Sequence, residues 1–240
     1  MKEQLRRLVL SAPVLRRPAA KALRVVRKIG FSGSADFWEH HYAGGGTSGP
    51  GSYGEFAEFK ADVLNSFVHD KQVISVIEFG CGDGNQLSLL RYQKYIGLDV
   101  SRTVLRRCKE RFADDLSKSF FLYDPFCFVD NGGVFRAELG LSLEVVFHLI
   151  EDDVFHQYMS HLFSSATRYV SVFSSDTDEQ MSRTPEVRHR RFTAWVEQHA
   201  SEWQLVQRVP HPHPWDAATS TGSLSEFFFF ARTNGEGVVA

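Results

Sequence analysis

VISVIEFGCGDGNQLSLL, residues 73–90, is the stretch of sequence that decides the fold. Its first part is rich in Val and Ile and ends near Glu78, which suits an extended strand. Gly80, Gly82 and Gly84 follow at alternating positions, where the main chain can approach a ligand more closely than any Cβ would allow. The Leu-rich remainder predicts a helix. The stretch therefore predicts a strand, a ligand-binding glycine loop and a helix.

A second acidic residue ends the next short apolar run, residues 95–100. Asp99 lies 21 residues after Glu78, and Ser101 is placed to cap a following helix. In a parallel α/β unit the tips of consecutive strands lie side by side. The Asp99 carboxylate can therefore accept hydrogen bonds from a ribose diol bound over the glycines.

The glycine spacing separates two families of ligand. A dinucleotide fingerprint G-x-G-x-x-G would need glycine where Asn85 stands, whereas E-x-G-x-G-x-G is satisfied from Glu78 to Gly84. With VIEFGCGDG and YIGLDVS as motifs, the chain resembles the class I S-adenosylmethionine-dependent methyltransferases over roughly residues 50–232. The resemblance implies one α/β domain, with a Rossmann-like seven-stranded, mostly parallel sheet, an antiparallel last strand and helices on both faces.

The resemblance also implies how S-adenosylmethionine is bound. The glycines would lie under its methionine and ribose, Glu78 near its amino group, Asp99 on the ribose hydroxyls and residues after the third strand at the adenine edge. Turn initiation before Pro125 is the structural alternative for Asp124. The cofactor residues implied are Glu78, Gly80, Cys81, Gly82, Gly84, Asp99, Val100, Tyr123, Asp124 and Ser142.

The resemblance implies that the acceptor side of the site lies after the fourth strand, where residues 144–153 lead into a helix. A hydroxyl acceptor is a weak nucleophile until its proton is removed, and histidine titrates near neutrality. His148 is therefore the first candidate for a general base, with Glu144, Asp152 or Asp176 as substitutes. A histidine that only caps or packs beneath the helix is the alternative. The predicted acceptor contacts are Tyr42, Ser52, Tyr53 and Asp176.

Hydrophobic patterns place the remaining elements. A helix over 54–68 is predicted from a Ser52–Glu55 capping box and an apolar face of Phe56, Phe59, Val63 and Phe67. Thr184 and Pro185 predict another helix start. Four consecutive phenylalanines in 226–232 predict a last strand that is buried on both faces. The other predicted elements are strands over 120–124, 137–143, 168–173 and 203–209, and helices after residues 101 and 153.

Charge divides the chain. Residues 1–30 hold nine Lys or Arg and one acid, a net of +8, and the remainder has 18 basic and 28 acidic residues, a net of −10. This basic arm predicts peripheral membrane or protein contact, a targeting peptide, or a tail that packs on its own acidic body. The acidic body argues against nucleic acid as a partner. Residues 31–54, rich in glycine and aromatics without helical or strand periodicity, are the predicted lid of a 31–232 domain, and 233–240 form a polar tail.

Composition predicts a soluble, cytoplasmic protein. Hydrophobic residues make up 43% of the 240, and no apolar run approaches the roughly 18 residues of a membrane span. Three cysteines match no disulfide or zinc pattern, which favours a reducing compartment. His211 and His213 lack a third ligand, so no metal site is predicted.

The acceptor is predicted from two further stretches. GSYGEFAEFK (51–60) and RHRRFTAWVE (188–197) resemble a small bacterial group of methyltransferases associated with polysaccharide or glycan modification. We therefore expect O-methylation of a saccharide or another small hydroxyl acceptor. N-methylation of a small amine is one alternative. A non-catalytic module that docks a partner through its basic arm is another, and an NAD-dependent oxidoreductase is a remote third.

Overall fold

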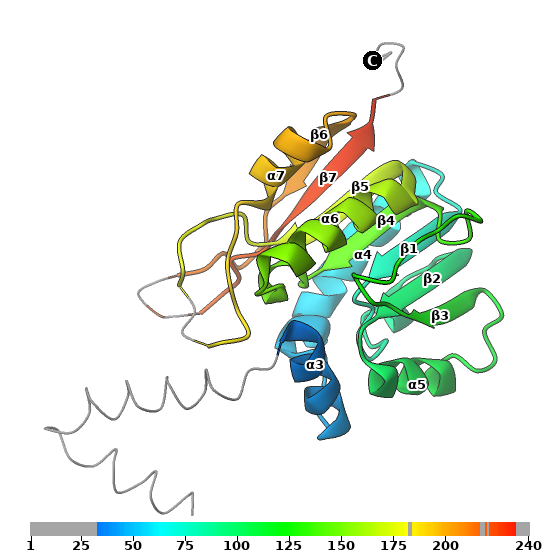
Figure 1. Cartoon of the computed structure of the whole chain (residues 1–240). Helices are drawn as coiled ribbons and strands as arrows, with labels where there is room; N and C mark the ends of the chain where they lie inside the picture. The colour runs from blue at the N-terminus through cyan, green and yellow to red at the C-terminus, as the bar shows by residue number, and fades with distance from the viewer. Residues whose placement is uncertain (1–32, 182–183, 217–218, 220, 234–240) are drawn as a thin grey trace, which may run out of the picture.

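The computed structural model describes residues 33–181, 184–216, 219 and 221–233 (Figure 1). The basic arm and nearly all of the polar tail lie outside these residues. A single seven-stranded sheet runs through the described part in the order β3-β2-β1-β4-β5-β7-β6. Its strands are β1 Ser75–Phe79, β2 Lys94–Asp99, β3 Lys118–Leu122, β4 Ala137–Leu143, β5 Ala166–Ser174, β6 Trp203–Val209 and β7 Glu226–Arg232. This is the predicted Rossmann-like architecture.

Parallel pairing at the centre of the sheet positions the site. β1 lies between β2 and β4 and is parallel to both, with Phe79 opposite Leu98 and Glu78 opposite Leu141. The carboxyl ends of the three strands therefore meet at one edge of the sheet. The loops that follow them face a common space, as the sequence predicted.

The last strand is antiparallel and inserted, as predicted. β7 pairs with β5 on one side and β6 on the other, antiparallel to both. Phe227 and Phe229 join the hydrophobic cluster on one face of the sheet, whereas Phe228 and Phe230 join the cluster on the opposite face. All four are buried, which explains why the sequence of this strand does not alternate.

Helices cover both faces of the sheet (Figure 1). α4 Gly54–Asp70 and α5 Arg102–Arg111 pack in one cluster, and α6 Asp152–Ser165 and α7 Phe192–His199 pack in the other. Ser101 caps α5 as predicted, because its Oγ accepts a hydrogen bond from the Val104 amide at 3.1 Å. No helix in the described part of the chain is long and apolar enough to cross a membrane.

The prediction of a helix after the glycine loop is wrong. Only a 3-10 turn, Leu87–Leu89, stands between the loop and β2. The residues that would begin a helix are held by other elements, since Asn85 Nδ2 donates to Ser52 O at 2.7 Å and Gln86 Nε2 to Ala57 O at 3.0 Å. These bonds tie the end of the loop to the start of α4.

The predicted helix start at Thr184 is also wrong, because α7 begins at Phe192. The backbone between Thr184 and Phe192 forms hydrogen bonds with other segments of the chain. The Arg188 amide donates to Phe147 O at 2.8 Å, and the His189 amide donates to Gln180 Oε1 at 3.1 Å. Tertiary hydrogen bonds have replaced the helical ones that the Thr-Pro signal predicts.

Residues 31–54 were expected to be irregular, and this expectation is wrong in part. They contain α3, Ser34–Ala43, and a 3-10 turn, Pro50–Ser52. The short helix was missed because its buried residues, Ser34 and Tyr42, give no apolar periodicity. Residues 31 and 32 lie outside the described part.

The start of α4 differs from the predicted capping box. Tyr53 is the N-cap residue, without a side-chain capping bond, and Ser52 lies in the preceding turn. The buried face of α4 is displaced by about one residue from the predicted stripe. Its buried residues are Ala57, Lys60, Ala61, Leu64, Phe67 and Val68.

Truncation of the inserted strand should destabilise the protein. Phe229 is fully buried, and its ring stacks on Phe67 with centroids 4.3 Å apart. Phe229→Ala is expected to lower the free energy of unfolding by about 3–5 kcal/mol, measured by urea denaturation. Val206→Ala, at a half-exposed position of edge strand β6, is the control and should change it by less than about 0.5 kcal/mol. Equal losses would contradict the central place of β7.

Candidate functional site

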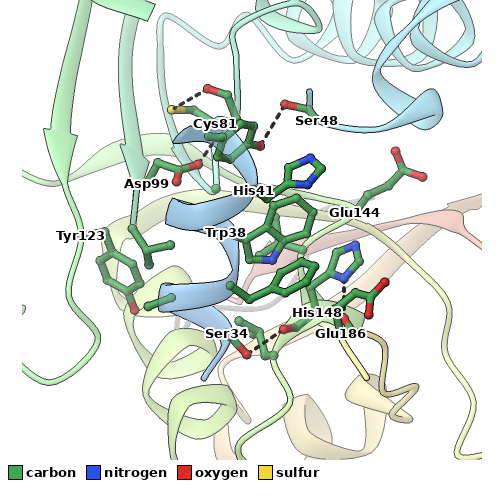
Figure 2. A pocket seen from close by; sticks show the side chains of 18 of the residues that line it. Ser34, Trp38, His41, Ser48, Cys81, Asp99, Tyr123, Glu144, His148 and Glu186 are labelled. Atoms are coloured by element: carbon green, nitrogen blue, oxygen red, sulfur yellow. Dashed lines mark hydrogen bonds between the residues drawn. The ribbon is translucent and has the colours of Figure 1, made fainter. Parts of the chain in front are cut away.

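A cavity of about 900 Å³ lies beyond the carboxyl ends of β1, β2 and β4, where open α/β sheets bind ligands (Figure 2). The glycine loop, the tip of β2 and the connection after β4 form its wall on the sheet side. Residues 33–52 close it from the other side. The predicted site residues that line it are Tyr42, Ser52, Glu78, Gly80, Cys81, Gly82, Asp99, Val100, Tyr123, Asp124, Glu144 and His148.

Gly80 and Gly82 cannot be replaced without movement of their neighbours. Both have positive φ, 81° and 59°, which side-chain-bearing residues rarely adopt. A Cβ on Gly80 would lie 2.5 Å from Val145 Cγ2, and one on Gly82 would lie 2.3 Å from Ser48 Oγ. The loop is thus folded tightly against both the β4 connection and the segment that covers the cavity.

Asp99 binds the glycine loop directly. Its Oδ2 accepts a hydrogen bond from the Gly82 amide at 3.0 Å, and its Oδ1 accepts one from the Ser101 amide at 2.9 Å. Burial raises the pKa of Asp99 to about 6, although these backbone bonds favour the ionised form. A buried carboxylate that faces the glycine loop is suited to accept hydrogen bonds from a diol.

Glu78 lies deeper in the wall of the cavity. Its Oε2 accepts a hydrogen bond from the Tyr95 hydroxyl at 2.5 Å. Burial raises the pKa of Glu78 to about 7, and the positive charge of Lys60 acts in the opposite direction. Tyr95 therefore occupies one of its carboxylate oxygens. A contact of Glu78 with the amino group of a ligand stays a prediction.

The residues after β3 extend the site beside Asp99. The Tyr123 amide donates to Asp99 O at 2.9 Å, and its hydroxyl lies 2.9 Å from His161 Nδ1. Asp124 Oδ1 accepts the Phe126 amide at 2.9 Å, as in a turn. The structural alternative for Asp124 is therefore observed, and an adenine contact stays a prediction.

His148 is presented to the cavity in one tautomer. Its Nδ1 lies 2.7 Å from Glu186 O, and because a carbonyl oxygen only accepts, Nδ1 carries the proton. Nε2 is then the acceptor of the neutral ring. Burial lowers the pKa of His148, so the neutral form dominates near neutral pH. The Trp38 ring packs against it edge to face, with centroids 4.8 Å apart.

Glu144 lies beside His148 in the cavity, at the end of β4. It has a φ of 58°, a strained conformation for a residue other than glycine. Lys60 Nζ lies 2.7 Å from its Oε2. Figure 2 shows Glu144 and His148 on one side of the pocket and Asp99 and Tyr123 on the other. The pocket thus has two chemically different ends.

Three groups of bonds hold residues 33–52 over the cavity. Near the start of α3 the Ser34 hydroxyl donates to Glu151 Oε2 at 2.6 Å. In the middle Glu39 Oε2 accepts the Ser101 hydroxyl at 2.7 Å. After α3 the Ser48 amide donates to an Asp83 oxygen at 2.9 Å. The segment is therefore tied to three parts of the domain.

Two residues predicted to bind the cofactor do not line the cavity. Gly84 faces α5 instead, because a Cβ there would lie 2.8 Å from the Phe112 ring. Ser142 is fully buried within the sheet, and its Oγ lies 2.7 Å from the Tyr158 hydroxyl. Both are structural residues. They carry the correct spacing but point away from the pocket.

Two predicted acceptor residues also lie outside the lining. The Tyr53 hydroxyl donates to Asp83 Oδ2 at 2.7 Å and so holds the glycine loop, without lining the cavity. Asp176 accepts the Thr193 hydroxyl at 2.7 Å and the Thr193 amide at 3.1 Å, which fixes the start of α7. Asp152, the other substitute base, pairs with Arg188 and Arg190 and is likewise absent from the lining.

The sequence did not single out several residues of the site. His41 of α3 projects into the cavity beside Trp38, an aromatic residue of the predicted lid (Figure 2), and Asp83 anchors the segment above it. Lys60 was missed although it lies at helical spacing from Ala57 and Leu64 on the buried face of α4, which was the available signal. Within the described residues no group of three or more His, Cys, Asp and Glu side chains could hold a metal ion.

Comparisons by sequence find methyltransferases. No family model matches the chain. The mouse eEF1A lysine and N-terminal methyltransferase is 34% identical over 82 residues, 33% of this chain and 11% of that protein. The Arabidopsis thaliana small RNA 2′-O-methyltransferase is 28% identical over 163 residues, 62% of this chain and 16% of that protein. The chain thus spans less than a fifth of the length of these relatives.

Comparisons by structure find the same class of fold. N-methyltransferase NodS from Bradyrhizobium japonicum WM9, in complex with S-adenosylhomocysteine, aligns with a TM-score of 0.65 and 15% identity, over 85% of this chain and all of NodS. The methyltransferase domain of bacterial CtHen1 aligns with a TM-score of 0.58 and 22% identity, over 73% of this chain and 97% of that domain. The chain therefore has the fold of the class I S-adenosylmethionine-dependent methyltransferases.

Proposed function

We propose that this chain is an S-adenosylmethionine-dependent methyltransferase that methylates a hydroxyl group of a sugar. The observation that carries this proposal is the His148 ring, held in one tautomer by Glu186 O, in the same cavity as the glycine loop and Asp99. A base at one end and a cradle for a ribose-bearing ligand at the other are what the reaction needs.

The cradle fits the cofactor. Gly80 and Gly82 bring main chain to the cavity wall in a conformation that glycine favours, and Asp99 presents a buried carboxylate for the ribose hydroxyls. A volume of about 900 Å³ is sufficient for the cofactor and a small acceptor. When bound there, S-adenosylmethionine would supply a methyl group activated by its sulfonium centre.

His148 supplies the proton chemistry. With S-adenosylmethionine bound, its methyl group would pass from the sulfonium sulfur to the acceptor oxygen, the carbon–sulfur bond breaking as the carbon–oxygen bond forms. His148 Nε2 would take the hydroxyl proton in this step, so that the ring becomes an imidazolium. The negative charge of Glu144 favours this protonated form. Residues 33–52 would exclude water from the reacting groups.

The acceptor is proposed from chemistry and from the relatives. Trp38 and His41 present rings to the cavity, which suits a sugar or a base attached to one. A small RNA 2′-O-methyltransferase is by its name specific for a ribose hydroxyl. The acidic body predicted that nucleic acid is not a partner, and this relative argues against that prediction. The proposed acceptor is therefore a hydroxyl of either a free saccharide or an RNA ribose.

An amine acceptor is the second candidate, because the mouse relative is named a lysine and N-terminal methyltransferase. A neutral amine reacts without a base. Transfer to an amine should therefore survive loss of His148, whereas transfer to a hydroxyl should not.

A labelled-methyl transfer assay tests the function. The acceptors are a panel of saccharides, RNA with its 2′-O-methylated counterpart as a control, and lysine-containing peptides. Label in saccharide or RNA, but not in the blocked RNA, is the expected result. If calorimetry finds no binding of S-adenosylmethionine or S-adenosylhomocysteine, the enzyme proposal fails and the non-catalytic module gains support.

Removal of the base should separate catalysis from cofactor binding. His148→Ala is expected to lower kcat by on the order of 10² to 10⁴ while S-adenosylhomocysteine binds with unchanged affinity in calorimetry. His69→Ala, at an exposed position on α4, serves as the matched control and should keep full activity. Full activity in His148→Ala would reduce His148 to a packing role.

Binding of S-adenosylhomocysteine should depend on the ionisation of Asp99. Its pKa is raised to about 6, and only the carboxylate accepts both hydrogen bonds of a ribose diol. Affinity should be full above about pH 7 and fall about tenfold by about pH 5, where roughly nine-tenths of Asp99 is protonated. Calorimetry across this range should find that Asp99→Asn binds weakly and lacks this component of the pH dependence. Equal pH dependence in both proteins would remove Asp99 from the site.

A further inference from the structure

Lys60 is a buried lysine in the middle of α4. Its side chain is 1% exposed, and it stands on the face of the helix that carries Ala57, Ala61 and Leu64 into the core. An ammonium group is strongly destabilised in such a place unless a charged or polar partner compensates for the lost water. The position therefore calls for an explanation beyond helix packing.

The partner of Lys60 is a residue of the cavity. Lys60 Nζ lies 2.7 Å from Glu144 Oε2, and it also lies over the Phe173 ring at 5.4 Å from the centroid. Glu144 lines the cavity together with His148. The buried cation thus reaches the site through one oxygen of this carboxylate.

Glu144 has little freedom to turn. Its φ is 58°, and its amide donates to Phe173 O at 2.8 Å. Gly51 packs so closely that a Cβ there would lie 2.1 Å from Glu144 Oε2. A constrained backbone, a close glycine and the Lys60 ion pair together fix the direction of the carboxylate. Such fixed charges stabilise a developing charge without reorganisation.

We propose that Lys60 is a positioning residue for methyl transfer. Its ammonium group fixes the Glu144 carboxylate beside His148, where the carboxylate stabilises the positive charge that His148 gains when it takes the acceptor proton. This inference rests on the proposed function of the site. It assigns to the helix before the glycine loop a part in the acceptor half of the pocket.

The charges around the pair are consistent with this role. Burial lowers the pKa of His148, and Glu186, Glu144 and His189 act on it as smaller influences, the two glutamates raising it and His189 lowering it. On the other side Lys60 lowers the pKa of both Glu78 and His211. The charge of Lys60 therefore acts on Glu78 of the cofactor end, while its ion pair is with Glu144 of the acceptor end.

Turnover of single and double variants tests the route through Glu144. Lys60→Met is expected to lower kcat by on the order of 10- to 100-fold, with little change in S-adenosylhomocysteine affinity. Loss of the hydrogen-bonded partner of a metal-binding side chain has an effect of this size in metalloenzymes. Lys60→Arg keeps the charge and should restore much of the loss. In a Glu144→Gln background, Lys60→Met should lower kcat no further than about twofold, because the residue through which it acts is gone.

The double variant also serves if Lys60→Met alone fails to fold, since it removes both charges together. A further large drop in kcat from Lys60→Met in the Glu144→Gln background would overturn the proposal. Leu64→Ala, one turn along on the same buried face, is the matched control. It should destabilise the fold without changing kcat or its response to Glu144→Gln.

A titration of the His148 ring by NMR supplies a readout that needs no acceptor. Glu144→Gln should lower the pKa of His148. Lys60→Met should change that pKa only while Glu144 is present, and Leu64→Ala should leave it unchanged. An equal effect of Lys60→Met with and without Glu144 would contradict the proposal. Absence of methyl transfer by the wild-type protein would instead count against the proposed function and leave this titration valid.

Discussion

The hydrogen bond from the Gly82 amide to Asp99 is the contact on which the rest of the site depends. It joins the loop after β1 to the tip of β2, and the Gly80 and Cys81 amides strengthen the junction by donating to Leu98 O at 2.7 and 3.0 Å. Parallel pairing of β1 with β2 brings these groups together. The glycine loop is therefore shaped by the sheet itself, and its geometry does not depend on a following helix.

The strands could be predicted from the sequence because each carries its own signal. β-branched or aromatic residues mark six of them, alternating leucines mark β4, and the four phenylalanines of β7 indicated its place inside the sheet. Helices were less predictable where side chains bond across the fold. Asn85 and Gln86 are held by the start of α4, so no helix follows the glycine loop. The helix start predicted at Thr184 is wrong because the backbone after it forms hydrogen bonds with other loops.

The site was predictable to the extent that topology places strand tips together. Asp99, Gly82 and His148 line the cavity because they follow strands whose carboxyl ends are neighbours. Spacing along the chain cannot say which way a side chain points, so Ser142 at the end of β4 was chosen although it faces the core. Contributions from distant helices, such as Lys60, depend on packing angles that no local pattern encodes.

The insertion of β7 has a consequence for the order in which the chain can fold. β6 pairs with β7 and with no other strand of the sheet. During synthesis β6 emerges first and has no neighbour until residues 226–232 leave the ribosome. Five strands can assemble from the first 174 residues, but the sheet can be completed only after the last strand arrives. A high share of non-local contacts of this kind slows folding. The exposed edge of β5 would meanwhile present unpaired backbone groups, which is where a chaperone would be most useful.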